Sequence, residues 1–220
     1  MSWFPDGHSI LCRGVIELNR LGLFRFDLES GKSNDLLILD DFGGLHGPVL
    51  SSDGKTIIYD LDDFENKVFR VLSYDLETKQ KKELIRSRSQ VLYKDVSPDG
   101  KQLAFWERQD NGHCLKVIPS SGGEAEILLR LEKDGGSINV NSVAWSPDGR
   151  SIYFSRGSKG DASDLWRVPA TGGQAEKFDM TSTGLTKISF RPDGKELAFM
   201  SWTITSEVWV MENFLPSEKK

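Results

Sequence analysis

The most acidic stretch of the chain, residues 60–66, carries enough side-chain oxygen atoms to be considered as a cation site. It reads Asp-Leu-Asp-Asp-Phe-Glu-Asn and lacks the glycine and the terminal glutamate spacing of a helical calcium-binding loop. Two interpretations stay open, weak calcium binding at residues 60–63 and a solvated acidic loop. Since the solvated loop requires no ligand, we predict that the chain holds no metal ion.

The residue types used by zinc proteins, hydrolases and nucleotide-binding proteins are also poorly placed for such chemistry. The three histidines, His8, His46 and His113, have no cysteine or histidine at zinc-ligand spacing. The sequence contains no Gly-x-Ser-x-Gly nucleophile elbow. Residues 31–33, Gly-Lys-Ser, lack the upstream glycine of a phosphate-binding loop. We predict that the chain is not an enzyme and needs no cofactor.

Composition narrows the classes of partner. The 220 residues carry a formal net charge of -5, and the isoelectric point is about 5.3. A nucleic-acid surface needs clustered lysine and arginine, so we predict no nucleic-acid partner. No stretch approaches the ~18 consecutive apolar residues of a membrane span, so we predict no direct membrane insertion. Cys12 and Cys114 lie in apolar runs and are predicted to be buried free thiols, which leaves the compartment open.

A tight turn recurs along the whole chain and organises it. Its clearest copy is Ser-Pro-Asp-Gly at residues 146–149, and each copy separates two apolar runs. The aspartate of the turn stands at Asp6, Asp53, Asp99, Asp148 and Asp193, with spacings of 47, 46, 49 and 45 residues. A period of this size marks a stack of repeated supersecondary units. Proline, aspartate and glycine at these positions are typical of a tight turn that closes an antiparallel hairpin.

Each repeat contains four apolar or alternating runs, with the tight turn between the first and second. The first runs end in a large apolar residue that we predict to be core: Trp3, Leu50, Val96, Trp145 and Phe190. The second runs, such as residues 57–59 and 197–199, are short and apolar, as in strands buried on both faces. The fourth runs carry the most charge. The sequence therefore predicts an all-β chain, a β-propeller of four-stranded antiparallel blades.

At this point a family resemblance is clear. The turn at residues 146–149 and the later segment Leu-Trp-Arg-Val-Pro-Ala-Thr-Gly-Gly, residues 165–173, resemble the propeller repeat of the TolB-like, WD-like bacterial family. Ser52 in place of proline and Phe4 in place of serine depart from that repeat. Residues 207–216 resemble the end of propellers attached to membrane-spanning sensor kinases and winged-helix regulators. The resemblance implies a protein-binding role and a periplasmic or otherwise extracytoplasmic location.

Five repeats are present, at about residues 1–39, 46–86, 91–130, 139–178 and 184–216, within a single propeller domain. The fifth lacks its outer strand, and the first residues of the chain are too few to replace it. We therefore expect the chain to be the C-terminal part of a longer protein whose propeller has six or more blades. The alternative is a self-contained ring of five blades, since ~4–8 blades are known to close.

The repeats also predict which face of the propeller binds. Tight turns leave the blades on one face, whereas the loops on the opposite face differ in length and are rich in acids. Variable loops held by a rigid scaffold are where binding residues are often found. The candidate partner-binding residues are Asp41, Phe42, His46, Asp62, Asp63, Phe64, Glu107, Asp110, Asp134, Asp161 and Trp202. We expect a non-enzymatic docking or sensing module for a protein or peptide, with a basic segment favoured by the acids. The alternatives are a merely solvated loop face, an accessory propeller of a peptidase or another enzyme, and a small-ligand or sugar-binding propeller.

Overall fold

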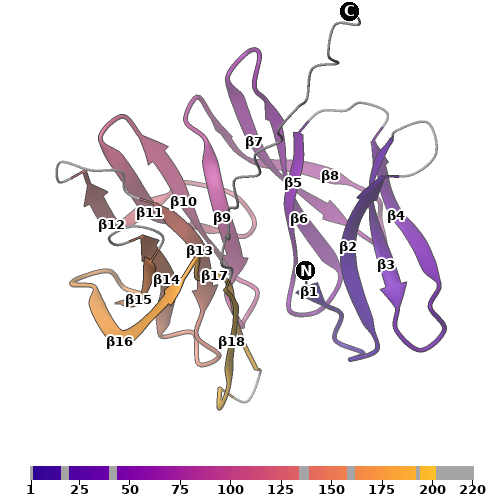
Figure 1. Ribbon diagram of the computed structural model, residues 1–220. Coiled ribbons are helices and arrows are strands. Elements are labelled where there is room, and N and C mark those ends of the chain that lie inside the picture. The colour runs from indigo at the N-terminus through magenta and orange to yellow at the C-terminus, as the bar shows by residue number, and fades with distance from the viewer. Residues whose placement is uncertain are drawn as a thin grey trace, which may run out of the picture.

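The structure is a computed structural model that describes residues 2–15, 20–39, 44–133, 139–157, 162–191 and 194–201, and this part of the chain is built of strands (Figure 1). In chain order the strands are β1 (Ser2–Trp3), β2 (Ser9–Val15), β3 (Leu21–Asp27), β4 (Ser33–Leu39), β5 (Gly44–Leu50), β6 (Thr56–Asp63), β7 (Val68–Asp75), β8 (Lys81–Ser87), β9 (Val91–Val96), β10 (Gln102–Gln109), β11 (Gly112–Pro119), β12 (Glu126–Glu132), β13 (Val140–Trp145), β14 (Ser151–Gly157), β15 (Ala162–Pro169), β16 (Glu176–Thr183), β17 (Thr186–Phe190) and β18 (Leu197–Met200).

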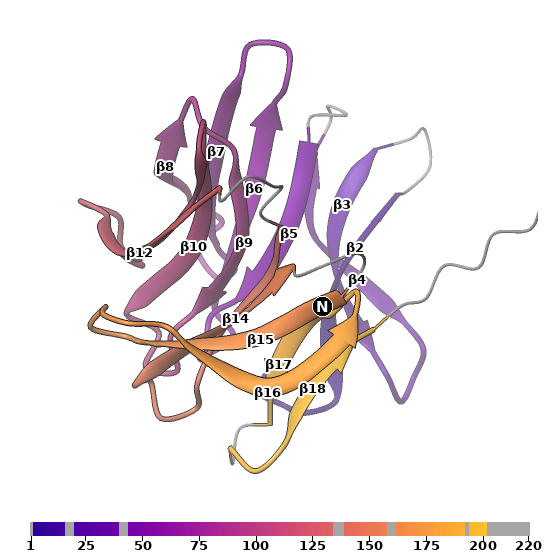
Figure 2. The ribbon, with the colours of Figure 1, turned by 60° about the vertical axis from the view of Figure 1, so that its left-hand side comes forward.

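The strands form four antiparallel four-stranded sheets, and β17 and β18 form a two-stranded sheet. We call β1–β4, β5–β8, β9–β12 and β13–β16 blades 1 to 4, and the pair β17–β18 blade 5. The first strands of consecutive blades lie next to each other, from β1 beside β5 to β13 beside β17. Figure 2 shows the sheets following one another around the molecule. The predicted all-β propeller is confirmed, and the third strand expected in the last repeat lies outside the described residues.

The repeated turn is held by its own serine and aspartate. In blade 4 the Ser146 hydroxyl donates to Asp148 Oδ1 at 2.6 Å, and the Arg150 N–H donates to the same oxygen at 3.0 Å. The Ser151 N–H then donates to Ser146 Oγ at 2.9 Å. The two hydrogen bonds to Asp148 Oδ1 lower the pKa of Asp148, with the serine hydroxyl as the largest cause. Because Gly149 has φ +69°, the turn also needs the residue type that adopts a left-handed backbone without strain.

The two hairpin turns of a blade lie side by side, which makes one face of the propeller. In blade 1 the Leu28 N–H donates to the His8 carbonyl at 2.9 Å, and in blade 4 the Ala170 N–H donates to the Arg150 carbonyl at 2.8 Å. Blades 2 and 3 have the same bond, and the paired turns of blade 1 are at the bottom of Figure 1. We call this the turn face. The connections β6–β7, β8–β9 and β10–β11 leave the opposite ends of the strands, and we call that side the loop face.

The apolar core lies between consecutive blades. Trp106 of blade 3 meets Trp145 and Phe154 of blade 4 in one cluster, and the Trp106 and Phe154 rings pack edge to face with centroids 5.2 Å apart. Leu23 of blade 1 and Ile57 of blade 2 belong to a second cluster of the same kind. Large aromatic and aliphatic side chains bury most of the area that stabilises a fold. Each blade therefore depends on its neighbours for its apolar contacts.

Two core predictions from the sequence are wrong at the ends of the array. The residue before the turn packs against the preceding blade, as Leu50 and Trp145 do, but Trp3 is 61% exposed because no described blade packs against that side of blade 1. Phe4 is buried in its place. Phe199 in the second strand of blade 5 is 39% exposed, since no third strand is described beside it.

The two cysteines are free thiols, as expected. Cys114 is buried, whereas Cys12 is only half-buried.

Polar side chains connect inner strands that share no backbone ladder. Asp95 of β9 accepts a hydrogen bond from the Trp145 N–H of β13 at 2.8 Å, and the Trp145 indole donates to the Asp95 carbonyl at 3.2 Å. Between blades 4 and 5, the Ile188 N–H donates to Ser142 Oγ at 2.9 Å. Burial raises the pKa of Asp95 to about 7, against two backbone hydrogen bonds that lower it. Asp95 therefore connects blade 3 to blade 4 through hydrogen bonds. Its carboxyl is mostly protonated below about pH 7.

Replacing Gly149 by alanine should lower stability because the new Cβ would occupy a backbone with φ +69°. The nearest side-chain atom to that Cβ is Pro98 Cδ at 3.8 Å, so space is not limiting and backbone strain dominates. We expect a loss of about 1–2 kcal/mol, the usual cost of a left-handed L-residue. Thermal unfolding measures it, and an unchanged midpoint would contradict the assigned turn conformation.

Replacing Asp95 by asparagine should stabilise the protein at pH 8. With a folded pKa near 7, the folded state holds a proton that the unfolded chain releases near pH 4, so wild-type stability falls as pH rises from about 4 to 7. Asparagine keeps an acceptor for Trp145 and removes this loss, for a gain on the order of 1–3 kcal/mol at pH 8. Urea unfolding at pH 5 and pH 8 tests this. Asp99→Asn, where turn hydrogen bonds lower the pKa, should destabilise at pH 8 instead.

Candidate functional site

The structure describes six of the eleven candidate residues. Asp41, Phe42, Asp134, Asp161 and Trp202 lie outside the described residues. The other six occupy two neighbouring blades: His46, Asp62, Asp63 and Phe64 belong to blade 2, and Glu107 and Asp110 to blade 3.

The structure brings the blade 2 candidates together. In the β5–β6 ladder, Gly44 pairs with Asp62 and His46 pairs with Asp60. The Phe64 ring lies 6.2 Å from the His46 ring, edge to face, and is 55% exposed.

Asp63 and Glu65 flank Phe64 in the chain. Asp63 accepts hydrogen bonds from the Asn66 N–H and side-chain amide, both at 2.9 Å, which lower its pKa. Glu65 is exposed. We call Asp63, Phe64 and Glu65 the blade 2 edge.

Asp62 is buried, contrary to its expected place among the exposed acids. Asp60 and Asp62 are each only 5% exposed, and Asp60 Oδ1 lies 2.6 Å from Lys94 Nζ of blade 3. The pKa of Asp62 is raised to about 6, mainly by burial and also by the neighbouring Asp60, while Lys94 opposes the change. The carboxyl of Asp62 is therefore buried near the Asp60–Lys94 pair, and its Oδ1 has no hydrogen-bond partner in the described part of the chain.

Glu107 is likewise an internal ion-pair partner and not a free surface acid. Its carboxylate lies 2.5 Å from Lys116 Nζ and accepts hydrogen bonds from Ser87 Oγ at 3.0 Å and Gln109 Nε2 at 2.8 Å. Asp110 at the following hairpin is exposed, and its carbonyl accepts a hydrogen bond from Lys133 Nζ at 3.2 Å. In the described residues, no group of three or more His, Cys, Asp or Glu side chains is placed to hold a metal ion.

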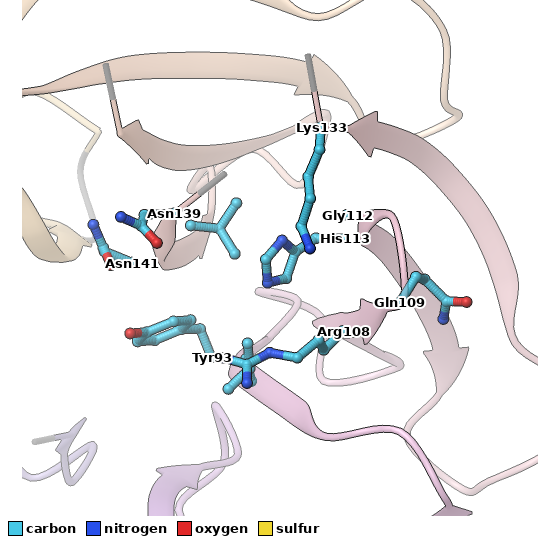
Figure 3. A pocket seen from close by; sticks show the side chains of 10 residues that line it. Tyr93, Arg108, Gln109, Gly112, His113, Lys133, Asn139 and Asn141 are labelled. Carbon is cyan, nitrogen blue, oxygen red and sulfur yellow. The ribbon is translucent and has the colours of Figure 1, made fainter. Parts of the chain in front are cut away.

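A pocket of about 390 Å³ opens on the loop face between blades 3 and 4, and we call it the blade 3–4 pocket. Tyr93 of β9, Arg108 of β10, His113 of β11 and Lys133, directly after β12, line it from blade 3, and Asn139, Val140 and Asn141 line it from the start of blade 4. In Figure 3 the side chains of Arg108, His113 and Lys133 converge on a common space, with Tyr93 and the asparagines across from them. The volume falls at the low end of the range of small-molecule sites.

The backbone that forms this pocket is irregular at two points. The β9–β10 register shifts between Lys94–Phe105 and Leu92–Trp106, which leaves Tyr93 unpaired with φ 35°. The same position in blade 2 is Gly47, with φ 45°, so the bulge belongs to the fold and the tyrosine side chain is the feature particular to blade 3. A bulge of this kind turns a side chain away from the ladder.

Gly112 is required where the β10–β11 hairpin meets β12. Its φ is +143°, and a Cβ built there would lie 1.9 Å from the Leu131 carbonyl oxygen. This close approach to β12 determines the position of the next residue, His113. The side chain of His113 is buried, with 7% of its surface exposed. His113 Nδ1 is buried and has no hydrogen-bond partner in the described part of the chain. Burial lowers the pKa of His113, and Arg108 and Lys133 lower it further, so the imidazole is neutral at pH 7.

The pocket carries positive charge, which sequence reasoning missed. Across the described ranges, no carboxylate lies within 4.0 Å of the Arg108 guanidinium or the Lys133 ammonium, and both side chains are exposed. In the sequence these two bases stand among many loop acids, but Asp62 is buried and Glu107 is paired with Lys116, which leaves the two bases dominant at the pocket. No motif signals the pocket, because its residues come from separate strands of two blades.

A family model described as TolB beta propeller domain matches residues 29–218. The chain belongs to this family. The "Uncharacterized peptidase YuxL" of Bacillus subtilis is 29% identical over 108 residues, which is 46% of this chain and 16% of that protein. The "Tricorn protease homolog 1" of Streptomyces coelicolor is 28% identical over 112 residues, 47% of this chain and 10% of that protein. The chain thus spans less than a fifth of either relative.

The solved structures agree on the fold. TolB from Acinetobacter baumannii matches with a TM-score of 0.70 and 18% identity over 88% of this chain and 47% of that one. At this identity the likeness shows the propeller architecture alone. The described part of this TolB-family propeller contains no helix long and apolar enough to cross a membrane.

Replacing Glu107 by alanine should destabilise the protein, because the change leaves the Lys116 ammonium in a largely buried place without its counter-ion. We expect a loss of about 3 kcal/mol in the free energy of unfolding. Asp110→Ala is the matched control on the same hairpin, where an exposed change should stay within about 0.5 kcal/mol. Urea unfolding of both variants gives the comparison, and equal stabilities would show that the Glu107–Lys116 pair contributes nothing.

Proposed function

We propose that this chain is a non-enzymatic propeller that docks a protein or peptide on its loop face, as part of a sensing or scaffolding protein. The observation that carries the proposal is the difference between the two faces. On the turn face, a backbone hydrogen bond joins the two hairpin turns within each of blades 1 to 4. The loop face has an exposed aromatic ring at Phe64 and a pocket with two cations that lack a carboxylate neighbour in the described residues.

The chemistry of the loop face indicates what such a partner would carry. The blade 2 edge combines an exposed aromatic side chain with the acids Asp63 and Glu65, which suits a basic residue next to an apolar one. Aromatic residues are frequent energetic anchors of interfaces. The blade 3–4 pocket has the opposite charge. We therefore propose a peptide or protein segment of mixed charge, and no nucleic acid.

A second candidate function is an accessory propeller of a peptidase. The similarity to YuxL and to the tricorn protease homolog favours it, since both are named as peptidases and the matched segment is only 16% of the first and 10% of the second. In that role the same loop face would contact peptide substrate or a catalytic domain. The two candidates share the docking surface and differ in what else belongs to the protein.

Selection of peptides on the purified chain tests the proposal. Ten-residue random peptides are selected by display, and the enriched sequences are synthesised and measured by fluorescence anisotropy. Phe64→Ala should weaken their binding by about tenfold or more, the loss expected for an interface anchor. Leu28→Ala is the matched control, because Leu28 is an exposed apolar residue on the turn face.

The control variant should bind within about twofold of wild type, and both variants should keep the wild-type unfolding midpoint. Loss of binding in Leu28→Ala alone would move the docking surface to the turn face. Failure to enrich any peptide would contradict the proposal.

A further inference from the structure

We propose that the blade 3–4 pocket is a subsite for a peptide carboxylate, either a free C-terminus with an aliphatic side chain or an acidic side chain. The proposal deepens the docking role above and rests on it for the peptide. It goes beyond that role by assigning a charge, a chemical group and a position to the ligand.

The first support is the charge of the pocket. Arg108 and Lys133 line it from separate blade elements, one in β10 and the other directly after β12. Within the described ranges neither has a carboxylate within 4.0 Å. Two cations held near each other repel, and a ligand carboxylate between them would relieve that repulsion and accept charge-assisted hydrogen bonds. A guanidinium in particular matches the two oxygens of a carboxylate.

The second support is His113, which lies between these cations in Figure 3 and points into the same space. The residue is more than nine-tenths buried, and its Nδ1 has no hydrogen-bond partner in the described part of the chain. Buried polar atoms in native proteins nearly always have a partner, so an unpartnered one next to a pocket indicates a group that is not part of the chain. A neutral imidazole can donate one hydrogen bond to a carboxylate oxygen.

The third support is the shape of the rest of the pocket. Leu92 and Val140 give it an apolar wall, and the Tyr93 ring is turned toward it by the β9 bulge. In blade 2 a glycine occupies the bulge position, so the tyrosine is not needed for the backbone conformation. A carboxylate beside an aliphatic side chain is the end of a peptide chain, which fits cations and an apolar wall together. The two cations alone would suit a phosphate as well, and the apolar wall of Leu92 and Val140 is what favours a peptide carboxylate.

Binding of a labelled hexapeptide to the full chain tests the assignment. The probe is fluorescein–Ser-Gly-Ser-Gly-Ser-Leu with a free C-terminal carboxylate, and anisotropy gives its affinity at low salt. Two related probes separate the sources of the carboxylate. One has the same sequence ending in an amide, and the other ends in an amide with glutamate in place of leucine.

The pocket variant carries Arg108→Gln together with Lys133→Gln. The matched control carries Lys67→Gln together with Arg88→Gln, two other bases of the loop face, so the net charge changes equally. All four side chains are exposed, and thermal unfolding confirms that both proteins stay folded. We expect the pocket variant to bind the free-carboxylate probe at least about tenfold more weakly than wild type, and the control within about twofold.

The outcomes separate clearly. A tenfold loss on amidation supports a C-terminal carboxylate, and recovery with the glutamate probe supports an acidic side chain in the same subsite. Equal binding of the amidated leucine probe, or equal binding to the pocket variant, overturns the proposal. Competition by inorganic phosphate at lower concentration than acetate overturns the carboxylate assignment.

The test is also distinct from that of the docking role. Selected peptides that depend on Phe64 but not on Arg108 and Lys133 would leave docking intact and remove this subsite. Binding of the carboxylate probe that depends on Arg108 and Lys133, with no peptide enriched by the selection, would do the reverse.

Discussion

Packing between blades is the constraint on which the rest of this structure depends. A four-stranded sheet has two faces to cover, and here the neighbouring blades cover them, as Trp106, Trp145 and Phe154 show between blades 3 and 4. Trp3 occupies the same register position as Trp145. It is exposed because no described blade lies beside it, which shows that burial at this position requires a neighbouring blade. Polar contacts follow the same seams, since Asp95 and Ser142 accept backbone N–H groups of the next blade.

The two faces of the propeller differ in how their polar groups are satisfied. At the turn face, serine and aspartate satisfy the local backbone and adjacent turns share hydrogen bonds, so few groups remain for a ligand. At the loop face, polar side chains lie where two neighbouring blades meet. The apolar core between the blades has no room for these groups. Asp60 and Lys94 meet at the seam of blades 2 and 3, and His113 lies next to the seam of blades 3 and 4. The blade 3–4 pocket therefore forms between blades, whereas the blade 2 edge belongs to one blade.

The same seams determine the charge that a partner meets. Counting acids along the loops indicates a negative face, yet Asp62 and Glu107 are withdrawn into internal contacts. Arg108 and Lys133 stay exposed beside a pocket, so the described loop face has an acidic edge on blade 2 and a basic pocket on blades 3 and 4. The family model and the TolB structure support the propeller fold, and the distribution of charge over the loop face belongs to this chain's own residues.

The sequence by itself determined the repeat, the turns and the propeller class. Those features depend on residues within a few positions of each other, such as Ser146, Asp148 and Gly149. They can therefore be predicted from the order of residues alone. In the sequence His46 and Phe64 both fall in the second repeat, and the structure brings their rings together because β5 and β6 are neighbouring strands. The burial of Asp62, the pairing of Glu107 and the blade 3–4 pocket were decided only by the tertiary structure. Each depends on contacts between strands or blades whose distance in space a linear pattern does not encode.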